Sequence, residues 1–208
     1  MKKLLHIIAT PRAEESRTLK VSGVFLDSFT KKYPDCKIET LNVATENLPL
    51  LTVKRITGKY TLLSGKDLSD DLKTAWKDIV KYIEQFLSAD AYLVSTPMWN
   101  FGIPYTLKHY IDIILQPKYL FRYTEKGVEG LVKNKKMVII TSRGGDYNNS
   151  DYKPYDLQEP YLRTVFGFVG ISDIAFIHAQ PMDALGLEVQ SESIEKAAVL
   201  AKKIAEKF

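Results

Sequence analysis

The segment of residues 9–18 carries the side chains best suited to binding an anion. Thr10, Ser16 and Thr18 have hydroxyl groups, and Arg17 has a permanent positive charge. The segment leads from an apolar stretch into a helical pattern, so free backbone N–H groups at the helix start would add further donors. These features predict a phosphate site. On this segment alone, however, we favour the simpler interpretation that Ser16 or Thr18 caps the helix.

A second group of residues offers a flat apolar surface. Met98, Trp99 and Phe101 surround Asn100, whose amide both donates and accepts hydrogen bonds. A planar heterocycle fits this combination of surfaces. Taken alone, these residues are explained better by ordinary core packing before a helix.

A third group combines polar residues with paired glycines. Ser142 and Arg143 precede Gly144 and Gly145. Paired glycines permit a positive φ and let the backbone approach a ligand closely. A simple turn explains the same four residues equally well.

The pattern of apolar residues predicts the elements that position these groups. Short apolar stretches rich in Ile, Val or aromatic residues predict strands at 4–9, 38–43, 91–95, 137–141 and 174–179. Helical periodicity and proline placement predict helices around 21–29, 68–86, 104–115, 157–168 and from 189 to the C-terminus. Strands joined by helices run parallel, so the fold class is α/β, an open doubly wound sheet with helices on both faces.

Two segments, 44–66 and 116–134, show neither pattern. We predict long loops there, with roles in an active site or in subunit contacts. Segment 146–157, rich in Tyr, Asn and Asp, gives no specific prediction.

The three polar groups follow the first, third and fourth predicted strands. In an open α/β sheet, ligands bind beyond the carboxyl ends of the strands, where the strand order reverses. The groups therefore meet at one edge of the sheet. A phosphate cradle, an aromatic wall and a close backbone approach are together the parts needed to hold flavin mononucleotide (FMN).

Composition narrows the class of protein. The chain has 208 residues, 45% hydrophobic and 26% charged, with a net charge of +4. These values predict one globular domain over residues 1–208, with no membrane span, no export signal and no nucleic-acid partner. The single Cys36 is consistent with a cytoplasmic protein. His6, His109 and His178 lack ligand spacing, so we expect no metal site.

Several motifs, in order along the whole chain, resemble those of the FMN-dependent NADH azoreductase and quinone reductase family. They are PMWNFGIP at 97–104 continued by LKHYID at 107–112, FRYTEKG at 121–127 followed by GL at 130–131, SRGG at 142–145, PYL at 160–162 and GFVGI at 167–171. The FRYT segment is absent from generic flavodoxins, which makes the resemblance specific. Thr10 and Thr18 stand where serines are common in the family.

The resemblance implies a flavodoxin-like fold, a five-stranded parallel sheet in a three-layer α/β/α sandwich. It implies a homodimer with one tightly bound, non-covalent FMN per subunit and active sites at the subunit interface. The implied phosphate contacts are Thr10, Ser16, Arg17 and Thr18, the ring contacts Met98, Trp99, Asn100, Phe101, Ser142, Arg143, Gly144 and Gly145, and the acceptor-pocket residues Tyr123 and Phe168. No side chain is assigned a catalytic role.

Two functions remain open. In the first, NADH or NADPH reduces the flavin, which then reduces a quinone or an azo compound in the same pocket. In the second, the protein is a flavodoxin-like electron carrier without small-molecule turnover. Such carriers tend to be shorter and strongly acidic, whereas this chain carries a charge of +4, so we favour the enzyme. Neither P-loop nor GxGxxG motifs, nor a Gly-x-Ser-x-Gly nucleophile, occur in the positions that nucleotide-binding or hydrolytic folds require.

Overall fold

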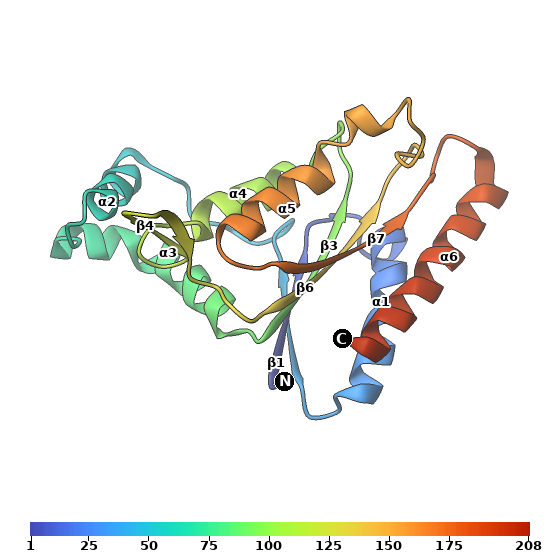
Figure 1. Ribbon diagram of the computed structural model, residues 1–208, viewed down its shortest axis with the longest axis horizontal. Helices are drawn as coiled ribbons and strands as arrows, with labels where there is room; N and C mark the ends of the chain where they lie inside the picture. Colours follow the sequence, from blue (N-terminus) through green and yellow to red (C-terminus); the bar gives the residue numbers. More distant parts are fainter.

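A parallel five-stranded sheet forms the middle layer of the protein, seen in a computed structural model of residues 1–208 (Figure 1). Its strands are β1 (Lys3–Ile8), β2 (Lys37–Asn42), β3 (Ala91–Pro97), β6 (Lys136–Ser142) and β7 (Asp173–Ala179). Their spatial order is β2-β1-β3-β6-β7. The order reverses between β1 and β3, which creates the crevice where α/β folds bind ligands. All five predicted strands are present, with ends shifted by one or two residues.

Helices cover both faces of this sheet (Figure 1). α1 (Arg17–Lys32) and α6 (Gly186–Lys207) pack together on one face, while α3 (Asp70–Ser88), α4 (Tyr105–Ile114) and α5 (Gln158–Phe168) cover the other. The predicted three-layer, flavodoxin-like arrangement is confirmed. None of the helices combines the length and apolar character needed to cross a membrane.

Alternating residues of the central strands pack on opposite faces of the sheet. In β1, Leu5 and Ile7 pack toward α3, α4 and α5, whereas Leu4 packs toward α1 and α6. In β3, Tyr92 and Leu93 point to opposite faces in the same way. Because both faces are buried, central strands in such a sheet are continuous apolar runs. This explains why they are recognisable in the sequence.

Segment 44–66 contains a helix, so the prediction of a long loop there is wrong. α2 (Val53–Leu63) starts at Thr52, whose side chain accepts a hydrogen bond from the Arg55 N–H at 3.4 Å. Only Gly58 and Leu62 of this helix are buried. A Cβ atom at Gly58 would lie 2.2 Å from the indole nitrogen of Trp76, so close packing requires glycine here. With so few buried residues, α2 leaves almost no apolar periodicity.

Segment 116–134 contains a hairpin, which also corrects the predicted loop. β4 (Phe121–Thr124) pairs antiparallel with β5 (Gly127–Gly130). At the base of the hairpin, a Cβ atom on Gly130 would lie 2.3 Å from the backbone nitrogen of Gly170. The Phe121 ring packs edge-on against Phe168, with centroids 4.8 Å apart. The hairpin is thus fixed to the end of α5 by its base.

Candidate functional site

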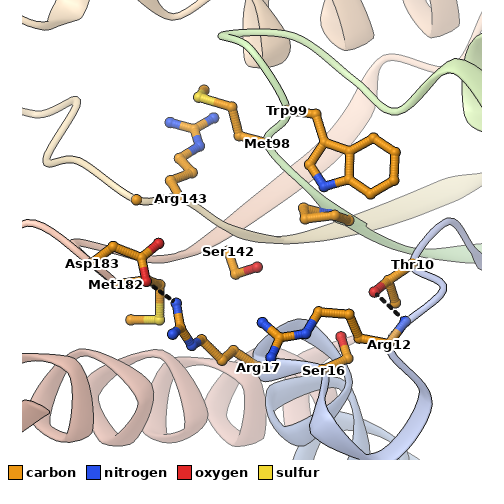
Figure 2. A pocket seen from close by; sticks show the side chains of 12 residues that line it. Thr10, Arg12, Ser16, Arg17, Met98, Trp99, Ser142, Arg143, Met182 and Asp183 are labelled. Atoms are coloured by element: carbon orange, nitrogen blue, oxygen red, sulfur yellow. Dashed lines mark hydrogen bonds and ion pairs between the residues drawn. The ribbon is translucent and has the colours of Figure 1, made fainter.

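A polar pocket of about 200 Å³ lies at the carboxyl ends of four strands (Figure 2). It is lined by Thr10, Arg12, Ser16 and Arg17 after β1, Pro97, Met98 and Trp99 around the end of β3, Ser142, Arg143 and Gly144 around the end of β6, and Met182 and Asp183 after β7. The structure therefore brings together the three groups that the sequence analysis selected. Thr18, Asn100, Phe101 and Gly145 belong to the same loops but do not line the pocket.

The start of α1 supplies unused hydrogen-bond donors to this pocket. Ser16 is the N-cap, and its side chain accepts a hydrogen bond from the Leu19 N–H at 3.3 Å. The N–H groups of Arg17 and Thr18 donate to no protein acceptor. The Arg17 guanidinium pairs with Asp183 at 2.6 Å. Ser16 thus combines the capping role with a place in the pocket, and the helix start keeps the free donors that anion binding needs.

The Thr18 hydroxyl, in contrast, is directed into the protein. Thr18 is fully buried, and its Oγ1 lies 2.7 Å from Ser142 Oγ. This contact ties the first turn of α1 to the end of β6. Of the two groups that Thr18 could offer a ligand, only its backbone N–H remains without a partner.

A buried polar cluster lies beneath this turn. Ser95 Oγ is 2.7 Å from both His6 Nε2 and Ser22 Oγ, and Ser22 Oγ also donates to the Thr18 carbonyl at 3.0 Å. Burial lowers the pKa of His6 to about 4, because removing the imidazolium from water disfavours its charged form. His6 is therefore neutral at physiological pH and holds β1 and β3 in register under the helix start.

The aromatic wall is built on a strained turn. Trp99 and Gly102 exchange two backbone hydrogen bonds, of 3.0 and 2.9 Å. Between them, Asn100 and Phe101 have φ values of 46° and 70°. Such left-handed conformations are costly for non-glycine residues and persist where the surroundings enforce them, often at functional sites. The turn displays Trp99 and Phe101 with 39% and 48% of their surfaces exposed.

The predicted glycine turn follows β6. Neither Gly144 nor Gly145 uses the positive φ that glycine permits. Their N–H groups nevertheless donate to no protein acceptor. The Gly144 carbonyl accepts hydrogen bonds from the N–H groups of residues 182–184, at 3.1 to 3.2 Å. The turn is therefore anchored through its carbonyl and keeps two N–H groups available.

The Arg143 side chain is bonded mainly inside the protein. Its side chain is 2% exposed, and its guanidinium donates to Gln158 Oε1 at 3.1 Å and to Asp156 Oδ2 at 2.9 Å. Figure 2 shows this side chain directed away from Arg17 and Ser16. Its backbone N–H and carbonyl are also bonded, to residues 179 and 182. Among the polar groups of Arg143, only the buried Nη2 has no hydrogen-bond partner, so a direct cofactor contact would have to use that nitrogen.

The Arg143 side chain connects the loop that follows β6 to the loop that follows β3. Gln158, which accepts from Arg143, donates through Nε2 to the Pro97 carbonyl at 2.8 Å. Burial lowers the pKa of Arg143, while the nearby carboxylates of Asp156 and Glu159 oppose that change. The guanidinium thus links the turn after β6 to the start of α5 and, through Gln158, to Pro97 at the end of β3, directly before the aromatic wall.

The other two histidines occupy separate places. His109 Nε2 lies 3.2 Å from the Pro49 carbonyl. His178 contacts Thr141 Oγ1 and Glu159 Oε2 at 2.8 and 2.7 Å, and burial together with Arg143 lowers its pKa. No set of three or more His, Cys, Asp or Glu side chains is arranged to hold a metal ion.

Comparison with known proteins places the chain in a family. Residues 2–204 match the family described by its flavodoxin-like fold. The FMN-dependent NADH:quinone oxidoreductase 2 of Clostridium perfringens (strain 13 / Type A) is 43% identical over 207 residues, which cover 98% of this chain and all of the relative. The chain belongs to this flavodoxin-like quinone oxidoreductase family.

Solved structures of azoreductases share the fold of this family member. An azoreductase from Bacillus anthracis str. Sterne matches with a TM-score of 0.90 at 30% identity, over 100% of both chains. An FMN-dependent NADH-azoreductase from Bacillus anthracis str. Ames Ancestor, solved in complex with FMN, matches with a TM-score of 0.84 at 30% identity, over 99% of this chain and 100% of that one. The family resemblance noted in the sequence is confirmed.

Four residues that line the pocket of this quinone oxidoreductase homologue were not predicted as site residues: Arg12, Pro97, Met182 and Asp183. Arg12 lies inside the predicted phosphate segment but precedes the helix start, where the anion site was predicted. Met182 and Asp183 follow β7. The rule that ligands bind beyond carboxyl strand ends applies to the fifth strand as well, and would have found both.

Tyr123 and Phe168 do not join the pocket of their own chain. Tyr123 lies on β4 and is 63% exposed, and Phe168 ends α5 and is 39% exposed. Phe121 lies between them, with ring centroids 5.9 Å from Tyr123 and 4.8 Å from Phe168. The two predicted acceptor-pocket residues therefore form a separate, exposed aromatic cluster.

Proposed function

We propose that this protein is an FMN-dependent oxidoreductase that uses NADH to reduce quinones or azo compounds. One observation carries the proposal: two pairs of unbonded backbone N–H groups, those of Arg17 and Thr18 and those of Gly144 and Gly145, lie on different loops of a single strand-end crevice. The relatives that share this fold over the whole chain are named for FMN, NADH and quinone or azo reduction.

The start of α1 fits the phosphate of FMN. The two free N–H groups, the Ser16 and Thr10 hydroxyls and the Arg17 guanidinium form a set of donors and positive charge suited to a dianion. The pocket itself, at about 200 Å³, is smaller than the usual 300 Å³ or more of a pocket for a whole small molecule. It suits the phosphate end of FMN, whereas the ring system requires the open surface beside it.

The wall from Met98 to Phe101 would provide that surface. The exposed rings of Trp99 and Phe101 can cover a flat heterocycle, and the Asn100 amide can bond to its polar edge. FMN, when bound, supplies the chemistry by accepting a hydride from the nicotinamide and passing reducing equivalents to the acceptor. The free N–H groups of Gly144 and Gly145 would stabilise negative charge at the ring edge that they face.

We propose that the active protein is a homodimer. Large apolar or aromatic side chains are exposed around the wall, among them Tyr105 at 75%, Leu157 at 61% and Tyr155 at 54%. Exposed apolar patches mark interaction surfaces. A second copy of the chain covering this surface would also bring the Tyr123 and Phe168 cluster of one protomer to the flavin of its partner.

The domain organisation, the location and the choice of enzyme over electron carrier complete the proposal. We propose that residues 1–208 act as a single FMN-binding domain, because the family match extends over residues 2–204. The lone and buried Cys36 supports a cytoplasmic location. The relatives are named as reductases of small molecules, which favours an enzyme over the electron carrier.

Cofactor analysis and anaerobic reduction test the function. We expect mass spectrometry of the released cofactor to find FMN and not FAD, because the phosphate loop offers one helix start and no glycine-rich loop for a pyrophosphate. NADH should bleach the bound flavin rapidly without any protein partner, and a panel of quinones and azo dyes should reoxidise it. FAD, the absence of flavin after reconstitution, or no reduction by NADH or NADPH would each contradict the proposal.

The variant Tyr123→Ala tests the proposed acceptor pocket. We expect the KM for quinones to rise several-fold, or kcat to fall, with FMN affinity nearly unchanged, because Tyr123 does not line the strand-end pocket of its own chain. Light scattering should show a dimer at assay concentration. A fully active monomer, or unchanged kinetics toward several acceptors, would refute the dimeric site.

A further inference from the structure

Three charged side chains share the phosphate end of the pocket. Arg12, Arg17 and Asp183 all line it, and Figure 2 shows the guanidinium groups of Arg12 and Arg17 pointing into the same space. Two guanidinium groups in one space repel each other unless an anion lies between them. Asp183 pairs with Arg17 at 2.6 Å but makes no ion pair with Arg12. One positive charge in the pocket is therefore left without an anion there.

The protein itself holds the Arg12 side chain only weakly. Its one ion pair, with Glu15, has an N–O distance of 3.4 Å, and the two side chains are 55% and 79% exposed. Exposed pairs of this kind contribute little. The backbone is better defined, because the Arg12 N–H donates to Thr10 Oγ1, which keeps the residue turned over the pocket. The guanidinium is thus free to exchange Glu15 for a stronger anion.

Asp183 is the only acidic residue that lines this pocket. Its backbone is fixed, since the N–H donates to the Gly144 carbonyl at 3.1 Å, whereas its side chain is 64% exposed and bonds to Arg17 alone. A carboxylate and a phosphate dianion repel each other and compete for the same guanidinium. The exposed carboxylate can turn outward into water when a phosphate arrives.

We propose that Arg12 is a second cationic ligand of the FMN phosphate, and that Asp183 is an internal competitor which occupies Arg17 until the phosphate displaces it. This inference rests on the proposed function. Arg17 exchanges a single carboxylate for a dianion, and Arg12 exchanges an exposed glutamate for the same dianion. Both exchanges favour FMN over flavins that lack the phosphate.

Binding of FMN and of riboflavin, which has the same ring but no phosphate, tests the proposal. Dissociation constants from flavin fluorescence quenching are compared for the wild type, Arg12→Ala and Asp183→Asn. Arg12→Ala should weaken FMN binding about tenfold, the effect of losing one partly exposed charge-assisted contact. Asp183→Asn should tighten FMN binding about threefold, because the competing anion is gone. Riboflavin affinity should not change in either variant.

Matched controls separate a local effect from a change in net charge. Lys31→Ala and Asp27→Asn alter the charge by the same amounts at exposed positions elsewhere on α1, and should leave both affinities unchanged. The proposal is overturned if Arg12→Ala behaves like Lys31→Ala, or if Asp183→Asn weakens FMN binding, which would mean that Asp183 orients Arg17 in the complex. A wild-type protein that binds neither flavin would instead overturn the proposed function itself.

Discussion

Arg17 and Arg143 lie on different sides of the same pocket and are bonded in opposite ways. The Arg17 side chain is 25% exposed and has one acidic partner. The Arg143 side chain is 2% exposed, and its guanidinium lies near two carboxylates and an amide. Around Arg17, backbone N–H groups are unbonded, whereas around Arg143 both backbone groups are used.

The comparison separates groups that bind from groups that hold the binding loops in place. A ligand can bond only to donors that the protein leaves free. The pocket around Arg17 can therefore bind an anion because the backbone N–H groups of Arg17 and Thr18 have no protein partner. The same residue type, when buried, must have its charge compensated inside the protein. We therefore expect Arg143 to stabilise the shape of the site and Arg17 to contribute to its affinity for the phosphate, as proposed.

Replacement of the two arginines should give the largest difference. Arg143→Met removes a buried cation and leaves Asp156 and Glu159 without it, which should lower the free energy of unfolding by about 3–5 kcal/mol. Arg17→Met breaks one partly exposed pair and should cost less than about 1 kcal/mol. Urea unfolding of the flavin-free proteins measures both. Equal small losses would show that Arg143 does not hold the loops.

The buried polar cluster beneath the start of α1 should make the stability of the protein depend on pH. The pKa of His6 is lowered to about 4 in the folded state, from an unfolded value near 6.5. Between pH 4 and pH 6.5 the unfolded chain binds more protons than the folded protein. The stability that neutral His6 contributes is therefore fully present above pH 6.5 and is lost as the pH falls through this range. His6 should account for roughly 2 kcal/mol lost between pH 7 and pH 5.

The variant His6→Gln isolates this contribution. Its stability should depend less steeply on pH than that of the wild type across the same range, by urea unfolding at several pH values. His178, whose pKa is also lowered, remains in both proteins and changes them in the same direction. Parallel pH profiles for the two proteins would contradict a neutral, buried His6.

Ser16 both caps α1 and lines the pocket, so its replacement should change stability and FMN binding together. Ser16→Ala should cost about 1 kcal/mol of stability, since it removes the N-cap of α1, and should also weaken FMN binding. Ser69 is the matched control, because it caps α3 by accepting from the Leu72 N–H at 3.4 Å, away from the pocket. Ser69→Ala should show a similar loss of stability with FMN affinity unchanged. Equal FMN affinities in the two variants would assign Ser16 to capping alone.

Gly144→Ala should have the smallest effect. The φ of Gly144 is not positive, and an added Cβ would lie 3.2 Å from Asp183 Oδ2, at the end of a movable side chain. The backbone should tolerate the change, with FMN and riboflavin affinities both falling about two- to threefold if the turn lies beside the ring, as proposed. A loss of affinity for FMN but not for riboflavin would show that the turn lies beside the phosphate and not beside the ring.

Most of the fold is predictable from the sequence because buried elements leave regular patterns. Central strands buried on both faces are continuous apolar runs, and α3 buries residues at helical spacing, including Trp76, Ile79 and Ile83. α2 and the β4–β5 hairpin were missed because they bury few residues. Both elements pack closely at a glycine, Gly58 against the Trp76 side chain and Gly130 against the backbone of residues 169–170, and such contacts leave no hydrophobic pattern in the sequence.

The site was predictable in position but not in the roles of its residues. The rule of carboxyl strand ends located the loops after β1, β3 and β6. Burial of Arg143 depends on Asp156 and Gln158, which come together with it only through tertiary packing. Gly144 and Gly145 permit a positive φ, but it occurs instead at Asn100 and Phe101, where the turn geometry overrides the preference of the residue.

The attachment of the β4–β5 hairpin makes the protein modular. Its base packs backbone on backbone at Gly130 and Gly170, whereas residues 122–128 are all exposed. Replacing the tip therefore leaves both hydrophobic cores and the strand-end pocket intact. If Tyr123 contacts the acceptor, as proposed, engineered tips of different size and polarity on a constant cofactor domain would change acceptor preference separately from flavin binding.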